Sequence, residues 1–254
     1  MRLALLSDLH ANLRALNACL AHARAAGATR YAVLGDLVGY GAEPAQVVQV
    51  VAELAQSGAP VLAGNHDLLA AQGLPPANTP QREDEIGAAW THDQLTPAQR
   101  EYLRSLPLTH ADGDALLVHA TADAPPAWHY ADHPVRVSRS MEAAAQLHQL
   151  RCVFGGHVHR QRMWFQGRVG DVMPFDPTPG EPVRLAPHRR WLATVGAVGQ
   201  PRDGDPRAAY ALFAPGPVPT LTFFRVEYEH LAAADAVRRA GLPERWARRL
   251  ETGL

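Results

Sequence analysis

Two histidines one residue apart, His157 and His159, directly follow a glycine pair in this sequence. The apolar run before them, Cys152 to Phe154, predicts a short buried strand, so both imidazoles are expected on a tight turn at a strand end. On an extended turn each ring can point at a different metal ion, and the glycines let the backbone pass close to a ligand. The pattern suggests a metal site, although one His-x-His pair alone is a weak signal.

Carboxylate, amide and imidazole side chains follow other predicted strands in the same way. Apolar runs at residues 2–6, 31–34, 60–63 and 115–118 predict further strands, and each run is followed by such residues. The polar residues at these strand ends are Asp8, His10, Asp36, Asn65, His66 and His119.

Some of these residues also have a purely structural explanation. Asp8 could cap the helix that begins near Asn12, and a single histidine after a strand, such as His119, is more often structural than functional. The order of elements favours the functional explanation. Strands that alternate with helices near Asn12 and from Pro44 predict parallel βαβ units, whose ligand sites lie beyond the carboxyl ends of the strands.

The combined set offers oxygen and nitrogen ligands without a thiolate, which suits Mn, Fe, Zn, Co or Ni better than Ca or Mg. Seven ligands exceed what one ion needs, and a carboxylate that bridges two ions accounts for the number. Two-metal sites hydrolyse phosphate esters by clamping the attacking and leaving oxygens. The candidates for these ligands are the eight strand-end residues Asp8, His10, Asp36, Asn65, His66, His119, His157 and His159.

The rest of the chain predicts the elements around this set. Helices are expected near residues 83–93, 97–105 and 138–150, and antiparallel strands through the second half. Residues 73–82, rich in Pro and polar side chains, predict a loop, and residues 230–251 predict a solvated helical tail. Because no repeat or linker is apparent, we expect one domain over residues 1–254.

Composition limits the partners and the compartment. The net charge of -1 and pI of about 6.9 give no sign of a nucleic-acid or membrane partner. Cys19 and Cys152 lack CxxC spacing and are expected to be buried free thiols. No apolar run is long enough to cross a bilayer, so a cytoplasmic protein is expected. The apolar residues of the second half leave a homo-oligomer open.

The order of these motifs resembles that of the calcineurin-like metallophosphoesterase superfamily. The resemblance implies an α/β fold, a four-layer α/β/β/α sandwich of two mixed β-sheets flanked by helices, which agrees with the parallel-then-antiparallel pattern. Five elements between residues 8 and 159 carry it: Asp8-x-His10, Gly35-Asp36, Gly64-Asn65-His66-Asp67, His119 and Gly156-His157-x-His159.

The resemblance also implies a role for each motif residue. Two transition-metal ions, Mn or Fe by preference, would lower the pKa of a bound water. The hydroxide that this water becomes would attack phosphorus in line. His66 corresponds to the family's non-ligand histidine, which stabilises transition-state oxygens or protonates the leaving alkoxide. One ion would be held by Asp8, His10 and His159 and the other by Asn65, His119 and His157, with Asp36 bridging both.

One position departs from the family pattern. Many members carry a second Asp three residues beyond the bridging one, where it helps to orient the non-ligand histidine. Here that position is Gly39, so the orientation of His66 is an open question, with Asp67 as a candidate substitute.

A second stretch indicates a branch of the family. The Gly39-Tyr40-Gly41 loop and residues 198–204 resemble small bacterial and archaeal phosphoesterases, a phosphodiesterase branch. There Arg202 is expected near the metal edge, in contact with a phosphate oxygen. A salt bridge from Arg202 to Asp203 or Asp205, without a substrate role, is the alternative.

The expected function is hydrolysis of a phosphoester or phosphoanhydride bond in a nucleotide-like small molecule, by a phosphodiesterase or dinucleoside polyphosphate hydrolase. Trp128 and Tyr130 are candidates to stack on such a substrate, and packing under their loop is the alternative. A phosphomonoesterase or serine/threonine protein phosphatase competes within the class. Outside it, a non-catalytic metal-binding scaffold for protein interactions is the alternative, and the charge balance disfavours a nuclease.

Overall fold

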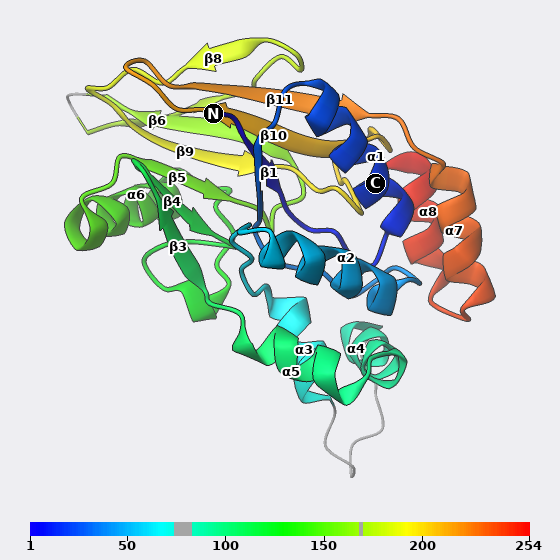
Figure 1. Ribbon diagram of the computed structural model, residues 1–254. Helices are drawn as coiled ribbons and strands as arrows, with labels where there is room; N and C mark the ends of the chain where they lie inside the picture. Colours follow the sequence, from blue (N-terminus) through cyan, green and yellow to red (C-terminus); the bar gives the residue numbers. More distant parts are fainter. Residues whose placement is uncertain (74–82, 168–169) are drawn as a thin grey trace.

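In the described part of the chain, eleven strands form two mixed β-sheets that pack face to face between helices (Figure 1). The computed structural model describes residues 1–73, 83–167 and 170–254. In the first sheet β1 and β2 are parallel and the other neighbours are antiparallel. Its order is β2 (Arg30–Val33), β1 (Leu3–Leu6), β10 (Ala208–Ala214), β11 (Thr220–Val226) and β8 (Pro182–Arg184).

The second sheet is mixed as well, because β5 lies parallel to both of its neighbours while the outer pairs are antiparallel. Its order is β3 (Thr109–Asp112), β4 (Ala115–Val118), β5 (Cys152–Gly155), β9 (Arg190–Val195), β6 (Gln161–Gln166) and β7 (Val172–Phe175). The strands predicted at residues 115–118 and before His157 are therefore confirmed, as β4 and β5.

Alternation along the strands separates the layers. In β1, Leu3 and Leu5 belong to the core between the two sheets, whereas Ala4 and Leu6 belong to the core under the helices. The helices on that side are α1 (Leu13–Ala25) and α2 (Pro44–Gln56). On the far side, α6 (Pro134–His148) covers the second sheet. The four-layer α/β/β/α sandwich is thus confirmed.

Capping residues fix the helix starts. The Asn12 side chain accepts a hydrogen bond from the Ala15 amide at 3.1 Å, and Pro44 opens α2. Two further predicted helices are present as α4 (Glu83–Gln94) and α5 (Pro97–Ser105), while a short 3₁₀ turn, η1, spans Pro125–Ala127.

The strand predicted at residues 60–63 is present only in part. This segment makes a single parallel bridge, between Val61 and Val33, rather than a strand. Pro60 has no N–H to donate, and the chain turns at Gly64 into helix α3 (Asn65–Gln72), which the sequence had not indicated. The predicted loop at 73–82 lies outside the described residues except for Gly73.

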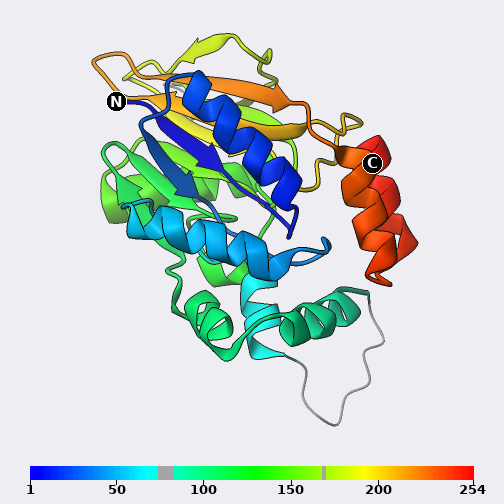
Figure 2. The ribbon, with the colours of Figure 1, turned by 45° about the vertical axis from the view of Figure 1, so that its right-hand side comes forward.

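The C-terminal segment is helical, as predicted, but it is not the solvated tail that was expected. Helices α7 (His230–Arg239) and α8 (Glu244–Thr252) form a hairpin that packs beside the rest of the chain (Figure 2). Trp246 is 1% exposed and meets the Tyr40 ring at 5.0 Å between centroids. This contact ties the hairpin to the loop after β2.

Two smaller expectations concern cysteines and membranes. Cys19 and Cys152 are buried free thiols, as predicted. Within the described ranges, no helix is long and apolar enough to cross a membrane.

Replacement of Trp246 tests the packing of the hairpin. Trp246→Ala should lower the free energy of unfolding by about 3–5 kcal/mol, because a large buried side chain leaves a cavity. Urea denaturation of this variant measures the change, and Arg248→Ala, at an exposed position of the same helix, should stay within about 0.5 kcal/mol of the wild type. A loss below about 1 kcal/mol for Trp246→Ala would contradict the packing described.

Candidate metal centre

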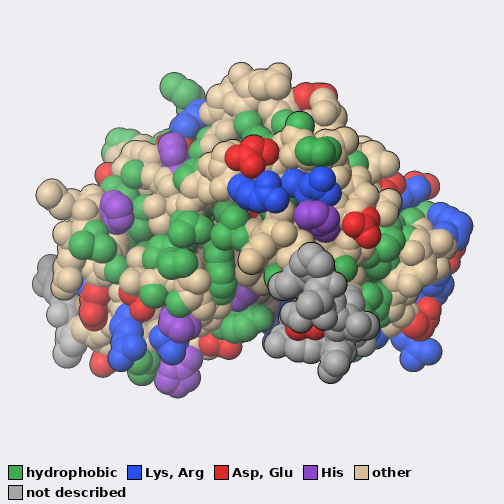
Figure 3. Space-filling view, turned by 90° about the horizontal axis from the view of Figure 1, so that it is seen from below, with side chains coloured by type: hydrophobic (Ala, Val, Ile, Leu, Met, Phe, Trp, Pro, Cys, Tyr) green, Lys and Arg blue, Asp and Glu red, His purple; other side chains and the backbone are tan. Residues whose placement is uncertain are grey.

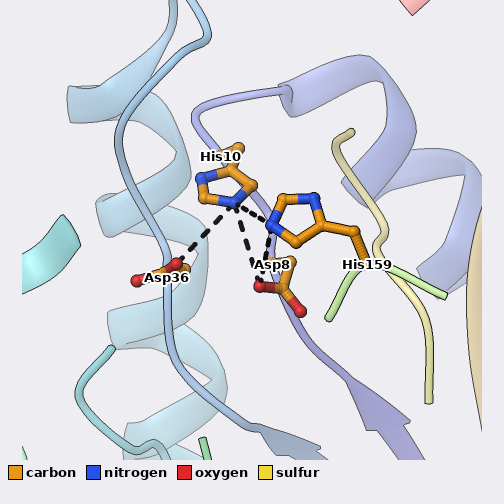
Figure 4. A group of neighbouring side chains, drawn as sticks. All are labelled: Asp8, His10, Asp36 and His159. Atoms are coloured by element: carbon orange, nitrogen blue, oxygen red, sulfur yellow. Dashed lines mark hydrogen bonds and ion pairs between the residues drawn. The ribbon is translucent and has the colours of Figure 1, made fainter. Parts of the chain in front are cut away.

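The loops that follow β1, β2 and β5 bring Asp8, His10, Asp36 and His159 into one buried group (Figure 4). The Nε2 atoms of His10 and His159 lie 3.1 Å apart, and His159 Nε2 lies 3.3 Å from Asp8 Oδ1. His10 Nε2 is also 3.7 Å from Asp36 Oδ2. Residues separated by up to 151 positions therefore direct their ligand atoms at one point.

A second group lies beside the first and shares Asp36 with it. It consists of Asp36, His119 and His157, all buried. His119 Nε2 is 3.3 Å from Asp36 Oδ2 and 3.2 Å from His157 Nδ1. One carboxylate oxygen of Asp36 thus faces both groups, while its other oxygen accepts a hydrogen bond from the His66 amide at 2.9 Å.

Backbone carbonyls fix the tautomers of all four histidines in these groups. A carbonyl can only accept, so the ring nitrogen that faces it carries the proton, and the other nitrogen of a neutral imidazole has a bare lone pair. The pairs are His10 Nδ1 with Val38 O at 3.1 Å, His119 Nδ1 with Leu34 O at 2.7 Å, His157 Nε2 with Trp128 O at 2.9 Å and His159 Nδ1 with Gln200 O at 2.6 Å.

The lone pairs left over point at one another and require a positive charge between them. A proton on His119 or a cation would relieve the contact between His119 and His157. A cation would also relieve the contact between His10 and His159, whose rings are both kept neutral by burial. Ligands bound to one ion at about 2.0–2.2 Å commonly lie ~3 Å apart, which matches these distances. The donor set therefore fits two metal ions.

Burial dominates the electrostatics of the groups. It lowers the pKa of His10 and His159 well below the usual range and that of His157 to about 4. Burial, reinforced by the charge of Asp36, raises the pKa of Asp8 to about 7. These imidazoles are consequently neutral at pH 7, the state in which they bind metal.

The Asp36 and His119 pair behaves differently. Burial opposes charge on both groups, but their mutual attraction holds the pKa of Asp36 well below its usual range and raises that of His119 to about 9. Without a metal, this part of the site attracts a proton in its place.

Asn65 and His66 are the first residues of α3, at the same edge. The Oδ1 atom of Asn65 is buried and has no hydrogen-bond partner among the described residues, which leaves an acceptor for a cation. The His66 ring lies edge-on to the His10 ring, with centroids 5.2 Å apart. His66 belongs to neither ligand group and borders the first of them.

The backbone at the site is unusually strained. Five of the ligating candidates have positive φ angles, between 44° and 66°: Asp8, His10, Asp36, His157 and His159. Residues other than glycine rarely adopt this left-handed region, and such strain is concentrated at functional sites. Two glycines allow the loops to lie this close together. A Cβ on Gly64 would collide with Asp36, and a Cβ on Gly156 would collide with Ser7 and Asp8.

The structure answers the question raised by Gly39. Its φ is +90°, and a Cβ there would lie 2.8 Å from His66 Nδ1, so the histidine ring occupies the space of the missing side chain. Asp67 does not substitute for it, since its two oxygens accept from the Leu37, Val38 and Gly64 amides. The Tyr40 ring instead packs against His66, with centroids 4.6 Å apart.

Arg202 lies beside the first candidate ligand group, next to Tyr40 and His159. Its guanidinium carbon is 5.3 Å above the Tyr40 ring, and its backbone amide donates to His159 O at 3.1 Å. The alternative salt bridges do not form, because Asp203 pairs with Arg225 and Asp205 with Arg207.

The two aromatic candidates both contact histidines of the second candidate ligand group. The Tyr130 ring stacks on His157 at 4.2 Å and 20° and is 48% exposed. Trp128 supplies the carbonyl that fixes His157, and its ring is 5.8 Å from His119. Trp128 is thus half-buried beside His119, whereas Tyr130 has more surface left for a ligand.

Sequence reasoning missed the role of Tyr40, although the Gly39-Tyr40-Gly41 motif contained it. It also missed Arg160 and Arg162, which follow the second histidine at alternate positions and line a cavity beside the site. The alternation after His159 was an available signal, whereas the carbonyls that hold the histidines have no sequence signature.

Comparisons with known proteins agree with this geometry. The model of the calcineurin-like phosphoesterase superfamily domain matches residues 1–215. A metallophosphoesterase crystal structure from Sphaerobacter thermophilus is 35% identical, with a TM-score of 0.84 over 100% of this chain and 99% of that chain.

Two other proteins are similar over nearly the whole chain. A hypothetical protein from Pyrococcus horikoshii OT3 shares the fold at 20% identity and a TM-score of 0.74, over 100% of this chain and 98% of that chain. An uncharacterized protein of Methanocaldococcus jannaschii is 29% identical over 257 residues, 99% of this chain and 98% of that protein. The chain therefore belongs to the calcineurin-like phosphoesterase superfamily and is a metal-dependent phosphoesterase.

Proposed function

We propose that this phosphoesterase uses two metal ions to hydrolyse phosphodiester or phosphoanhydride bonds in a nucleotide-like small molecule. The observation that carries the proposal is the pair of ligand groups that share Asp36 Oδ2. A site for one ion needs no second cluster of imidazoles behind the same carboxylate. The nucleotide-like part of the proposal is supported by Tyr130, an exposed aromatic ring next to His157.

The ligands divide between the two ions. Bound metal ions would lower the pKa of water and neutralise charge on the phosphoryl oxygens. The mixture of imidazole and carboxylate suits Mn and Fe, the metals we favour, as well as Zn, Co and Ni. We assign Asp8, His10 and His159 to one ion and Asn65, His119 and His157 to the other, with Asp36 bridging them.

His66 is assigned the proton-transfer role. Its ring borders the first ligand group through His10 without belonging to it, which supports a place for it beside a phosphate bound to the metal ions. We propose that it hydrogen-bonds the phosphoryl oxygens or protonates the leaving oxygen. Tyr40 positions this ring by packing against it above Gly39.

We further propose a cytoplasmic location, supported by two cysteines that are buried and unpaired. A homo-oligomer stays a prediction.

Replacement of Asp36 tests the shared ligand. Asp36→Asn should lower the metal content after reconstitution with Mn²⁺ by at least about one ion per chain and reduce turnover of bis(p-nitrophenyl) phosphate by roughly a thousandfold. Elemental analysis and steady-state kinetics measure both. Asp235→Asn, an exposed carboxylate on α7, serves as the matched control and should match the wild type. Full metal content in Asp36→Asn would show that the bridging assignment is wrong.

Replacement of His66 separates proton transfer from metal binding. His66→Ala should keep both metal ions yet lose about 10²–10⁴-fold in kcat. If the histidine protonates the leaving oxygen, the loss should be smaller for a p-nitrophenyl ester than for an alkyl ester of the same phosphate, because p-nitrophenolate leaves without a proton. Equal activity of variant and wild type on the alkyl ester would contradict the role.

Tyr40 should act through its ring rather than its hydroxyl. Tyr40→Ala should lower kcat about tenfold or more by freeing the His66 ring, with metal content retained, whereas Tyr40→Phe should restore most of the activity. The pH profile of kcat should change in Tyr40→Ala and not in Tyr40→Phe. An equal loss in both variants would assign the effect to the hydroxyl and refute a packing role.

A further inference from the structure

A cavity of about 370 Å³ opens directly beside the metal centre. Its wall includes Val158, which lies between the two ligand histidines in sequence, and Tyr130, whose ring stacks on His157. Arg202, which borders the Tyr40 ring, forms another part of the wall. A molecule that reaches the metal centre would therefore have this space next to it.

Three arginines line the cavity, which we call the arginine pocket: Arg160, Arg162 and Arg202. One nitrogen of each guanidinium is anchored. Arg160 Nε donates to the Arg202 carbonyl at 2.7 Å, Arg162 Nε to Asp176 Oδ1 at 3.0 Å, and Arg202 Nη2 to Gln200 Oε1 at 3.1 Å. The anchors hold the three side chains in place before any ligand binds.

Among the described residues, the other nitrogens of these three guanidinium groups make no hydrogen bond to the protein. Arg202 Nε is buried without a hydrogen-bond partner in the part of the chain that the structure describes. A buried donor in this state costs free energy unless a ligand or water satisfies it. The planar fork of each arginine matches a phosphate group, which can accept two parallel hydrogen bonds.

The charge balance of the pocket is positive. Asp132 also lines it and opposes an anion, but three guanidinium groups outnumber this carboxylate. Asp176, the partner of Arg162, is 75% exposed, and such surface pairs are weak in water. Basic side chains lie beside acidic and histidine side chains on the face of the molecule seen from below (Figure 3).

We propose that the arginine pocket binds a second phosphate group of the substrate, distinct from the one hydrolysed. This inference rests on the proposed function and narrows it: the substrate is a polyphosphate compound, in which a phosphate next to the scissile bond reaches Arg160, Arg162 and Arg202. A diester with a single charge would leave the pocket without its ligand.

The test compares two substrates on one double variant. With Mn²⁺ supplied, kcat/KM is measured for diadenosine tetraphosphate and for bis(p-nitrophenyl) phosphate, in the wild type and in Arg160→Gln/Arg162→Gln. The kcat/KM for diadenosine tetraphosphate, divided by the kcat/KM for bis(p-nitrophenyl) phosphate, should be at least about tenfold lower in the variant. The main cause should be a higher KM for the tetraphosphate. Damage to the metal centre would lower both values together. Arg184→Gln, on β8 of the other sheet, should leave the ratio unchanged.

A ratio within twofold of the wild type in the double variant would overturn the pocket proposal while leaving the phosphoesterase assignment intact. Absence of Mn²⁺-dependent turnover of both substrates by the wild type would instead contradict the proposed substrates. In that case, equilibrium binding of inorganic tripolyphosphate tests whether the arginine pocket binds phosphate, because this assay does not depend on turnover. The double variant should bind it at least about tenfold more weakly than the wild type, and equal binding would refute the proposal.

Discussion

The structure depends on histidine lone pairs that face one another inside the protein. Backbone carbonyls of Val38 and Gln200 fix the protons of His10 and His159 on the far side of each ring, so their Nε2 atoms meet without a proton at 3.1 Å. Burial prevents either ring from taking a proton to relieve the contact. The fold therefore holds a cation site ready, and the carboxylate of Asp36 extends it to a second group of ligands. Metal binding should in turn stabilise the folded protein.

The same geometry explains why the loops are strained. Each left-handed residue other than glycine costs roughly 1 kcal/mol or more, and five ligating candidates adopt that conformation. The packed sheets hold the loop ends, while Gly64 and Gly156 let neighbouring backbone approach the carboxylates. Tyr40 extends this support outward, because its ring contacts both His66 and Trp246 of the C-terminal hairpin. Helix α8, beyond the region matched by the family model, thus packs against a wall of the site.

Much of the site could be predicted because its residues follow apolar strands. The runs before Asp8, Asp36 and His157 are buried on both faces, so their ends were visible in sequence. Helix α3 was not visible, since its eight residues show no clear apolar stripe, and Pro60 to Ala63 has strand composition but only one bridge. The C-terminal hairpin was misjudged although Ala233, Val237, Trp246 and Leu250 recur at helical spacing. The carbonyl partners of the histidines could not be predicted, because any residue supplies a carbonyl and only tertiary structure places it.

The shared two-metal centre can be tested by a crystal structure of the protein grown with Mn²⁺ and measured at a wavelength where manganese scatters anomalously. We expect two anomalous peaks on either side of Asp36 Oδ2, one contacted by Asp8, His10 and His159 and the other by Asn65, His119 and His157. A single peak, or peaks away from Asp36, would contradict a shared two-metal centre.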